Sequence, residues 1–344
     1  MKKILSLFMC IALIISLCSC SYSDIFNLYT DYDGELIVHF IDVGQGDCTL
    51  LESDNEFMLI DAGEAEYSAT VCQYLENNRV KKLDYVVATH PHSDHCGGLT
   101  EVLNTFSCDN FITVETDQQT RSWLNVLDAV SKNDVNYIDA KVGATYSLGK
   151  SEFEILGPYS DNYDNYNDYS VVIKATFGST SFLFTGDAER LAEHEMLDHG
   201  ADVSADVLRV PHHGSSSSSS KEFLSAVSPT YGVISCGYQN DYGHPHKETL
   251  RSLSNIGVTT YRTDTLGTIV AATDGNNIEF FYENTDVKVE TPDPVHYIGN
   301  KNSMKFHISS CSSVSDIKIE NKVTFSSRED AIKKGYTPCK ACDP

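Results

Sequence analysis

The segment that decides the fold reads His90-Pro91-His92-Ser93-Asp94-His95, and it directly follows an apolar run, residues 85–89, with the composition of a β-strand. Imidazole and carboxylate groups are the ligands that borderline metals such as zinc prefer. Three histidines and one aspartate at the end of a strand can surround one or two adjacent cations. A histidine-rich surface loop is the weaker alternative, because the segment lies between an apolar strand and Gly97-Gly98. The sequence therefore predicts a metal centre.

This segment closely resembles the ligand motif of hydrolases with the metallo-β-lactamase fold. The resemblance implies that His90 and His92 bind a first metal and that Asp94 and His95 bind a second. It also implies that a hydroxide held by both metals is the nucleophile, because coordination lowers the pKa of water towards neutrality. Asp94 is therefore expected to be catalytic as well as a ligand.

Two further motifs follow in the order of that family. Asp61, in Leu59-Ile60-Asp61-Ala62-Gly63, resembles the carboxylate that supports the ligand loop through hydrogen bonds. Asp187, in Phe184-Thr185-Gly186-Asp187, resembles the carboxylate that bridges the two metals. An aspartate after Thr-Gly is usually a turn residue, so this assignment depends on motif order and on the strand that precedes it.

Residues 39–47, 210–215 and 242–246 more closely resemble the hydrolase domain of ComEC-type DNA-uptake proteins, over about residues 35–285. That resemblance implies that His244, in Gly243-His244-Pro245, is the last metal ligand. His212 and His213 are then expected beside the site, as an extra ligand or as the general acid for the leaving group. Which histidine has which role stays open, and His246 has a weaker case.

The chain departs from the family after its central strands, where most binuclear members carry a histidine that completes the shell of the first metal. The corresponding stretch reads Tyr166-Asn167-Asp168-Tyr169-Ser170 and has no histidine. Asn167, Asp168 or His213 are the candidates for that position. Oxygen-rich ligation would shift the preference from zinc towards manganese. Occupancy by a single metal is a further alternative.

Strands and helices alternate through the chain, which predicts a layered α/β fold, the αββα sandwich of the family, over residues 35–285. The polar run at residues 215–220 predicts a flexible loop. Residues 159–169, with four tyrosines, predict an exposed polar loop in preference to a mobile loop that stacks bases or sugars. The expected strands are residues 36–41, 48–52, 57–60, 85–89, 153–156, 171–175, 182–184, 207–210 and 231–235, and the expected helices are 69–77, 99–104, 188–197, 221–226 and 247–255.

The N-terminus predicts export. Lys2-Lys3 precede an apolar run, residues 4–17, that is short for a transmembrane span. The following Leu17-Cys18-Ser19-Cys20 resembles the lipobox of bacterial lipoproteins, which implies cleavage before Cys20 and lipidation of its thiol. Residues 1–20 are then the lipoprotein signal segment, with the lipidated Cys20 as its last residue, and residues 21–34 a tether, so the chain is expected on the outer side of a bacterial membrane. A signal anchor or a plain secretory signal are the alternatives.

Charge and cysteine content divide the chain into two modules. The net charge is −24, which disfavours nonspecific DNA binding but does not exclude a nuclease, because divalent metals supply positive charge locally. Residues 21–294 carry a net charge of −29 and residues 295–344 one of +3. We therefore expect a linker at residues 286–295. The scattered Cys48, Cys72, Cys96, Cys108 and Cys236 indicate no disulfide framework.

The C-terminal module, residues 296–344, has the ligand types and spacing of a structural zinc site: His307, Cys311, Cys339 and Cys342. We expect a small α+β fold stapled by zinc, because about 50 residues have little core of their own. The module resembles the zinc-binding start of Ada DNA-repair proteins. Because His307 stands where Ada has its reactive cysteine, alkyl transfer is not expected, and the module would be a DNA- or wall-binding accessory. A disordered tail is the alternative.

These observations predict an extracytoplasmic metal-dependent hydrolase with two zinc or manganese ions. The ComEC-type resemblance implies a phosphodiester substrate, such as single-stranded DNA, whereas the ligand spacing itself indicates only hydrolysis. The alternatives on the same scaffold are hydrolases of a lactone, a β-lactam, a thioester or a phosphocholine ester. A surface-binding lipoprotein that holds metal structurally is an alternative from a different class.

Overall fold

The computed structural model describes residues 35–287, 289, 297–308, 311–325 and 328–342. The expected signal peptide, Cys20, the tether and most of the expected linker lie outside the described residues. No helix within these ranges is both long enough and apolar enough to cross a membrane.

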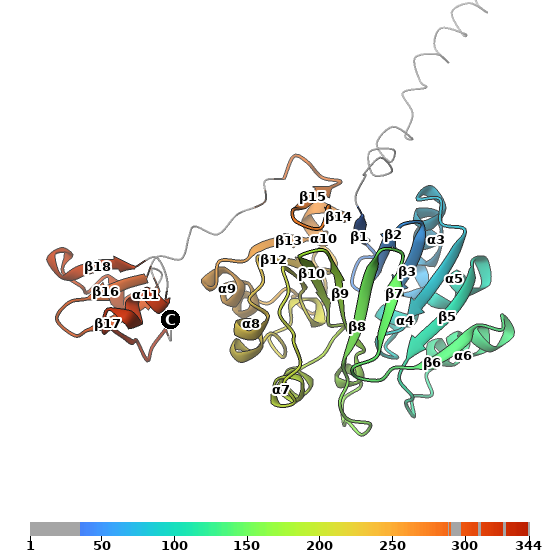
Figure 1. The fold of residues 1–344 in the computed structure, drawn as a ribbon, viewed down its shortest axis with the longest axis horizontal. Coiled ribbons are helices and arrows are strands. Elements are labelled where there is room, and N and C mark those ends of the chain that lie inside the picture. Colours follow the sequence, from blue (N-terminus) through green and yellow to red (C-terminus); the bar gives the residue numbers. More distant parts are fainter. Residues whose placement is uncertain (1–34, 288, 290–296, 309–310, 326–327, 343–344) are drawn as a thin grey trace, which may run out of the picture.

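The first sheet has eight strands in the order β15-β14-β1-β2-β3-β4-β5-β6 (Figure 1). All five residues of β1 are buried, because both faces of the sheet are covered. The bounds are β1 Leu36–Phe40, β2 Thr49–Ser53, β3 Glu56–Ile60, β4 Lys82–Val87, β5 Ser107–Thr113, β6 Asn136–Asp139, β14 Ile269–Thr273 and β15 Ile278–Tyr282.

The second sheet has seven strands in the order β13-β12-β11-β10-β9-β8-β7. Its strands β10 to β13 are parallel to one another, whereas β7 to β10 are antiparallel. The bounds are β7 Thr145–Leu148, β8 Ser151–Gly157, β9 Val172–Phe177, β10 Thr180–Phe184, β11 Val207–Arg209, β12 Tyr231–Ile234 and β13 Thr259–Arg262.

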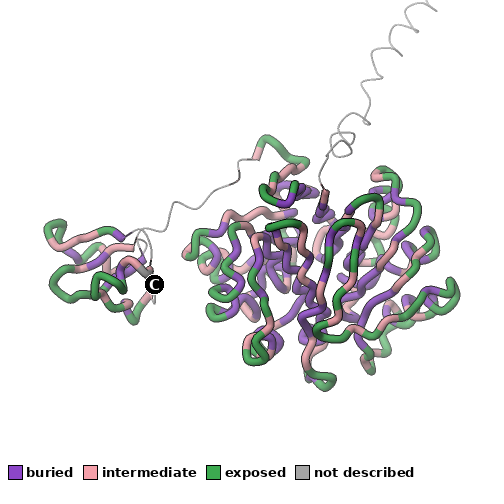
Figure 2. Tube along the Cα trace, in the orientation of Figure 1, coloured by how far each residue is buried: buried purple, intermediate pink, exposed green. Residues whose placement is uncertain are grey.

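The two sheets pack face to face, and helices cover their outer faces, so the predicted αββα sandwich is confirmed (Figures 1 and 2). The core between the sheets joins residues such as Phe40 and Phe182. One outer core packs α3, α5 and α6 on the first sheet, and another packs α7, α8 and α9 on the second. The helices are α3 Ser68–Asn77, α4 Ser93–Cys96, α5 Leu99–Thr105, α6 Arg121–Lys132, α7 Arg190–Asp198, α8 Lys221–Val227, α9 Lys247–Asn255 and α10 Thr263–Leu266.

Parallel strands place the sequence motifs at one edge of the sandwich. In the first sheet β3 and β4 are parallel, so Asp61 and the segment that begins at His90 leave the sheet side by side. In the second sheet β10 and β11 are parallel, so Asp187 and His213 follow neighbouring strand ends. Loops at the carboxyl ends of parallel strands share one edge of a sheet, which is the usual position of a site in such folds.

The serine-rich run, residues 215–220, forms the predicted loop, but several of its residues are buried and hydrogen-bonded. Ser219 and Ser220 donate their backbone N–H groups to the carboxylate of Glu193, which is fully buried in α7. The hydroxyl of Ser218 donates to the Ala188 carbonyl oxygen at 2.9 Å. The Ser220 hydroxyl also caps α8 by accepting from the Phe223 N–H. Small hydroxyl side chains here satisfy buried polar groups, which composition alone does not reveal.

The C-terminal module has its own four-stranded sheet in the order β18-β16-β17-β19. Its core is small and is built on Phe306, Phe325 and Ala331. The bounds are β16 Tyr297–Asn300, β17 Lys305–Ile308, β18 Lys322–Phe325, α11 Arg328–Lys333 and β19 Thr337–Pro338. The described elements therefore form the small α+β unit that the sequence predicts.

Glu193→Ala should lower the free energy of unfolding by about 3 kcal/mol, because it leaves two backbone N–H groups without their charged acceptor. Urea denaturation followed by circular dichroism measures this change. The matched control is Glu76→Ala in α3, an exposed position where the change should stay within about 0.5 kcal/mol. Equal effects at both positions would contradict the role given to Glu193.

Candidate metal centre

Four side chains converge between the two sheets: Asp94, His95, Asp187 and His213. One ligand atom from each lies within 4.8 Å of the others. His95 Nε2 is 3.2 Å from Asp187 Oδ1, and His213 Nε2 is 3.3 Å from Asp94 Oδ2. His95, Asp187 and His213 are buried, and Asp94 is partly exposed. Two imidazoles and two carboxylates form a donor set typical of a divalent transition metal.

The hydrogen bonds around this group fit a bound cation. His95 Nδ1 lies 2.8 Å from Asp61 Oδ2, and His213 Nδ1 lies 3.0 Å from the Ser235 carbonyl oxygen. Each Nδ1 therefore carries the proton, and each Nε2 presents a lone pair to the centre. His95 Nε2, His213 Nε2 and Asp187 Oδ1 are buried and have no hydrogen-bond partner among the residues that the structure describes. Since buried polar atoms are rarely left unpaired, these atoms fit metal ligands.

His90 and His92 form a second group of candidate ligands beside the first. His90 Nε2 is 3.0 Å from His92 Nδ1, and the His90 ring lies 4.2 Å from the His95 ring. Burial is the largest cause that lowers the pKa of both His90 and His92, so both rings stay neutral and able to bind metal. His90 and His92 therefore lie as two further neutral imidazoles beside the converging group.

Asp61 joins the two ends of the loop that carries these ligands. Its Oδ1 accepts from the Thr89 N–H at 2.8 Å, and its Oδ2 accepts from the Thr89 hydroxyl at 2.7 Å. Oδ2 is also the partner of His95 Nδ1. The contacts are those expected of the supporting carboxylate in the sequence motif.

The adjacent histidines His212 and His213 face different surroundings. His213 is buried in the converging group, whereas His212 is partly exposed beside it. His212 Nδ1 is 3.2 Å from Glu189 Oε1, and His212 Nε2 is 3.7 Å from Asp187 Oδ2. Although burial lowers the pKa of His212, the hydrogen bond with Glu189 raises it above its ordinary value. The same bond holds the pKa of Glu189 at about 2.

His244 lies beside the converging group but outside it. Its ring is 5.6 Å from the His212 ring and 6.2 Å from the His213 ring. Burial lowers its pKa to about 4, and its Nδ1 has no hydrogen-bond partner. The geometry therefore favours His213 over His244 as the histidine that closes the group with Asp94. His246 precedes α9, and its Nδ1 accepts from the Ser216 N–H at 2.9 Å, so it belongs to a loop contact.

Arg209 and Asp47 are two residues of the site that sequence reasoning missed. The Arg209 guanidinium is buried, pairs with the Asp47 carboxylate and donates to the Gly186 carbonyl oxygen at 2.7 Å. Asp47 also lies 3.7 Å from His95 Nδ1 and 3.6 Å from His213 Nδ1. Burial lowers the pKa of Arg209 to about 9, which leaves it charged at neutral pH. The available signal was a single arginine inside an otherwise apolar strand.

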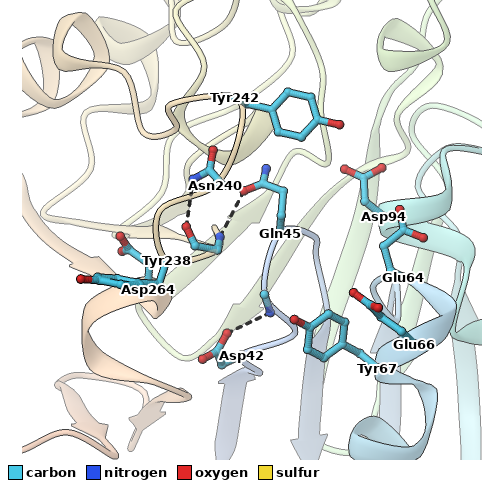
Figure 3. A pocket seen from close by; sticks show the side chains of 12 residues that line it. Asp42, Gln45, Glu64, Glu66, Tyr67, Asp94, Tyr238, Asn240, Tyr242 and Asp264 are labelled. Carbon is cyan, nitrogen blue, oxygen red and sulfur yellow. Dashed lines mark hydrogen bonds between the residues drawn. The ribbon is translucent and has the colours of Figure 1, made fainter.

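A cleft of about 500 Å³ opens beside Asp94. Figure 3 shows its side chains around an open space, with Asp94 and Glu64 across from Tyr242 and Gln45. None of the residues that line it is a lysine or an arginine. Its lining includes five carboxylates and three tyrosines: Asp42, Glu64, Glu66, Asp94, Asp264, Tyr67, Tyr238 and Tyr242.

The loop predicted to be exposed, residues 159–169, is only partly so. Tyr163 and Tyr169 are buried and pack edge to face with ring centroids 5.1 Å apart. The Tyr166 ring lies 6.2 Å from His92, and its hydroxyl donates to Asp117 at 2.6 Å. Part of this loop therefore forms a wall of the metal centre.

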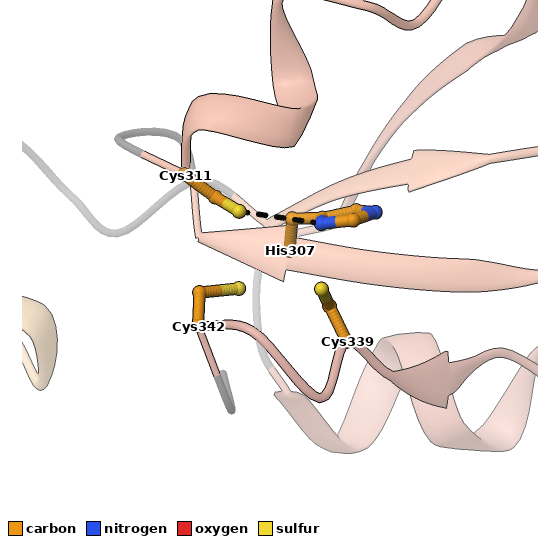
Figure 4. A group of neighbouring side chains, drawn as sticks. All are labelled: His307, Cys311, Cys339 and Cys342. Carbon is orange, nitrogen blue, oxygen red and sulfur yellow. Dashed lines mark hydrogen bonds between the residues drawn. The ribbon is translucent and has the colours of Figure 1, made fainter.

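The C-terminal module holds a second cluster of ligand atoms, shown in Figure 4. The side chains of His307, Cys311, Cys339 and Cys342 offer ligand atoms that all lie within 4.8 Å of one another. His307, Cys311 and Cys339 are buried. One imidazole and three thiols in a closed group are the donor set of a structural zinc site, and the cluster is consistent with the predicted zinc module.

The sequence matches the family described as the metallo-beta-lactamase superfamily over residues 41–238, more than half of its length. The chain therefore belongs to that superfamily. Its relatives include proteins of the ComEC type, as the sequence motifs predict. It is 28% identical to "ComE operon protein 3" of Bacillus subtilis over 73% of this chain and 34% of that protein. It is 29% identical to "Competence protein ComA" of Neisseria gonorrhoeae over 69% of this chain and 32% of that protein.

The chain thus spans about a third of the length of these relatives. Among solved structures, the metallo-beta-lactamase fold protein YhfI from Bacillus subtilis is similar with a TM-score of 0.47 and 14% identity. That match covers 72% of this chain and all of YhfI.

Asp47→Ala should lower the free energy of unfolding by about 3 kcal/mol, because it leaves the Arg209 guanidinium buried without its carboxylate. The double variant Asp47→Ala with Arg209→Met should recover part of that loss, since no uncompensated charge remains. Chemical denaturation of the two single variants and the double variant measures the coupling. Strictly additive effects would contradict a direct ion pair.

Cys339→Ser should remove about one equivalent of zinc and unfold the C-terminal module, because small metal sites contribute much of the stability of such folds. Elemental analysis counts the zinc, and hydrogen exchange reports loss of protection in residues 297–342. Protection in residues 35–285 should not change. The matched control is Cys72→Ser, a free cysteine in α3, which should keep the zinc.

Proposed function

We propose that the chain is a metal-dependent phosphodiesterase that acts outside the cytoplasm, with single-stranded DNA or another nucleic acid as a candidate substrate. The observation that carries the proposal is the convergence of Asp94, His95, Asp187 and His213, whose inward atoms are buried and unpaired. The similarity to proteins named for competence supports the substrate class.

In this proposal the second cation position is built by Asp94, His95, Asp187 and His213. The first position is built by His90 and His92, with Asp187 between the two. A divalent cation bound there supplies Lewis acidity and makes water acidic enough to react near neutral pH. Asp61 and the Ser235 carbonyl oxygen hold the Nδ1 protons of His95 and His213, so that both Nε2 atoms stay free for ligation.

We assign the general acid to His212. Its Nδ1 faces Glu189, so a proton on Nε2 points towards Asp187 and the centre. Unlike His213, it is partly exposed and therefore accessible to a leaving oxygen. A positioned acid of this kind contributes roughly 10²–10⁴-fold to rate.

The cleft beside Asp94 favours a second candidate substrate for the same hydrolytic chemistry. Asp264 pairs with Arg262 at 2.6 Å, and the other four carboxylates, without a lining lysine or arginine, would repel a long polyanion. Tyrosines beside carboxylates are the surroundings that attract a quaternary ammonium group. A phosphocholine ester is therefore the second candidate, ahead of a lactone or a β-lactam.

The proposal also covers the segments on either side of the catalytic domain. A lipid on Cys20 would tether the chain to the outer side of a bacterial membrane. The C-terminal module, with its net charge of +3 and its similarity to the Ada zinc module, would bind DNA or cell wall. Its positive charge complements such acidic polymers, whereas the catalytic domain is strongly acidic.

The chain without its first 20 residues, loaded with Zn²⁺ or Mn²⁺, should hydrolyse a chromogenic phosphodiester and either single-stranded DNA or a chromogenic phosphocholine ester. Asp94→Ala should abolish turnover because it removes a ligand. His212→Ala should lower kcat by about 10²-fold while metal content stays the same. Initial rates and elemental analysis measure both effects.

Two outcomes would contradict this proposal. Cleavage of only a lactone or a β-lactam would assign a different hydrolase to the same scaffold. A fully metal-loaded chain that turns over none of these substrates would indicate a binding lipoprotein.

A further inference from the structure

The first cation position lacks a histidine that most binuclear members of the fold carry. The stretch that replaces it forms a single 3₁₀ turn, Tyr166–Tyr169, beside His92. Three residues could complete the position: Asn167, Asp168 and His213. The structure distinguishes among them by what each side chain already contacts.

The Asp168 carboxylate already accepts hydrogen bonds from a helix terminus. Its Oδ1 accepts from the backbone N–H groups of Glu189 at 3.0 Å and Ala192 at 3.3 Å, at the start of α7. A carboxylate that caps a helix in this way satisfies backbone donors that otherwise have no partner. His213 is also used, because it closes the group with Asp94, His95 and Asp187.

Asn167 is the remaining side chain. The residue is 6% exposed, and its side chain reaches the imidazole of His92. Yet Asn167 Oδ1 is buried and has no hydrogen-bond partner of good geometry. An unpaired amide oxygen at a buried position is costly unless something else binds it.

Glu189 fixes which end of this amide faces the centre. Asn167 Nδ2 donates to Glu189 Oε1 at 3.0 Å. Because Glu189 Oε1 accepts this bond, the amide nitrogen faces Glu189 and the amide oxygen faces the opposite way. The same Oε1 accepts from the Ser217 hydroxyl at 3.1 Å.

We propose that Asn167 Oδ1 completes the first cation position with His90 and His92, and that Glu189 is the residue that positions this amide. The inference rests on the proposed function, because it assumes the paired cation positions assigned there. It gives the two positions different chemistry. The first has a neutral amide oxygen where the family has an imidazole, so it should select Zn²⁺ over Mn²⁺ less strongly than a position completed by a third imidazole.

The test uses the full-length chain and counts cations rather than turnover. Mn²⁺ titration followed by electron paramagnetic resonance should show two bound ions with unequal affinities. Asn167→Ala should lower the affinity for the more weakly bound ion by at least about tenfold and leave the affinity for the more tightly bound ion unchanged. Asp94→Ala should instead remove the stronger ion. Asn167→His should restore the weaker position and shift its preference to zinc.

Two variants separate ligation from folding. Asp168→Ala should lower thermal stability, because it removes a helix cap, but should keep both Mn²⁺ ions. Glu189→Gln should lower the Mn²⁺ affinity of the first position by about tenfold. The new glutamine amide can donate to the Asn167 oxygen, so the Asn167 amide can flip and turn its oxygen away from the cation. Asn167→Asp should keep the ion, because a carboxylate oxygen occupies the same place.

The inference is overturned if Asn167→Ala binds both Mn²⁺ ions with unchanged affinity. It is also overturned if the parent chain binds only one ion at this centre and still turns over a phosphodiester, an outcome that leaves the proposed function intact. If the parent chain binds no cation at this centre, the proposed function fails as well.

Discussion

The contact on which the centre depends is the buried carboxylate of Asp61. One oxygen holds the Thr89 backbone where the ligand loop begins, and the other holds His95 where it ends. Because β3 and β4 are parallel neighbours, this carboxylate reaches both points within a single layer of the sheet. The loop between them has little freedom left, so its imidazoles and carboxylate are positioned before any cation arrives. A preorganised ligand set binds metal without the cost of ordering it.

A second constraint is charge. Asp47, Asp61 and Asp187 are all buried at the metal centre. The guanidinium of Arg209 pairs with Asp47 and lies near Asp187. Removing several carboxylates from water is unfavourable unless nearby positive charge compensates. Arg209 supplies part of this charge, and divalent cations would supply the rest. The fold and the metal centre are therefore energetically coupled, and catalytic residues cannot be changed without some effect on stability.

Much of the fold was predictable from local patterns. The segment from His90 to His95, together with Asp61 and Asp187, indicated the superfamily because strand ends and ligand types coincide there. The strand Ser107–Thr113 was missed because polar residues interrupt its apolar spacing. The helix Arg121–Lys132 was missed although its buried Trp123, Val126 and Val130 have helical spacing. Asp47, Arg209 and Glu189 were missed for a different reason. Their roles depend on contacts between segments far apart in the chain, such as Asp47 with Arg209, and no local pattern encodes those contacts.

The carboxylates that line the cleft beside Asp94 have a consequence for how ionic strength should affect the protein. Most proteins that handle nucleic acids attract the polymer electrostatically and lose affinity as salt is added. The lining of this cleft has carboxylates and neither lysine nor arginine, so with no cation bound, added salt would screen repulsion instead of attraction. An anionic substrate would then be captured faster in concentrated salt than in dilute buffer, while a cationic one would follow the ordinary trend.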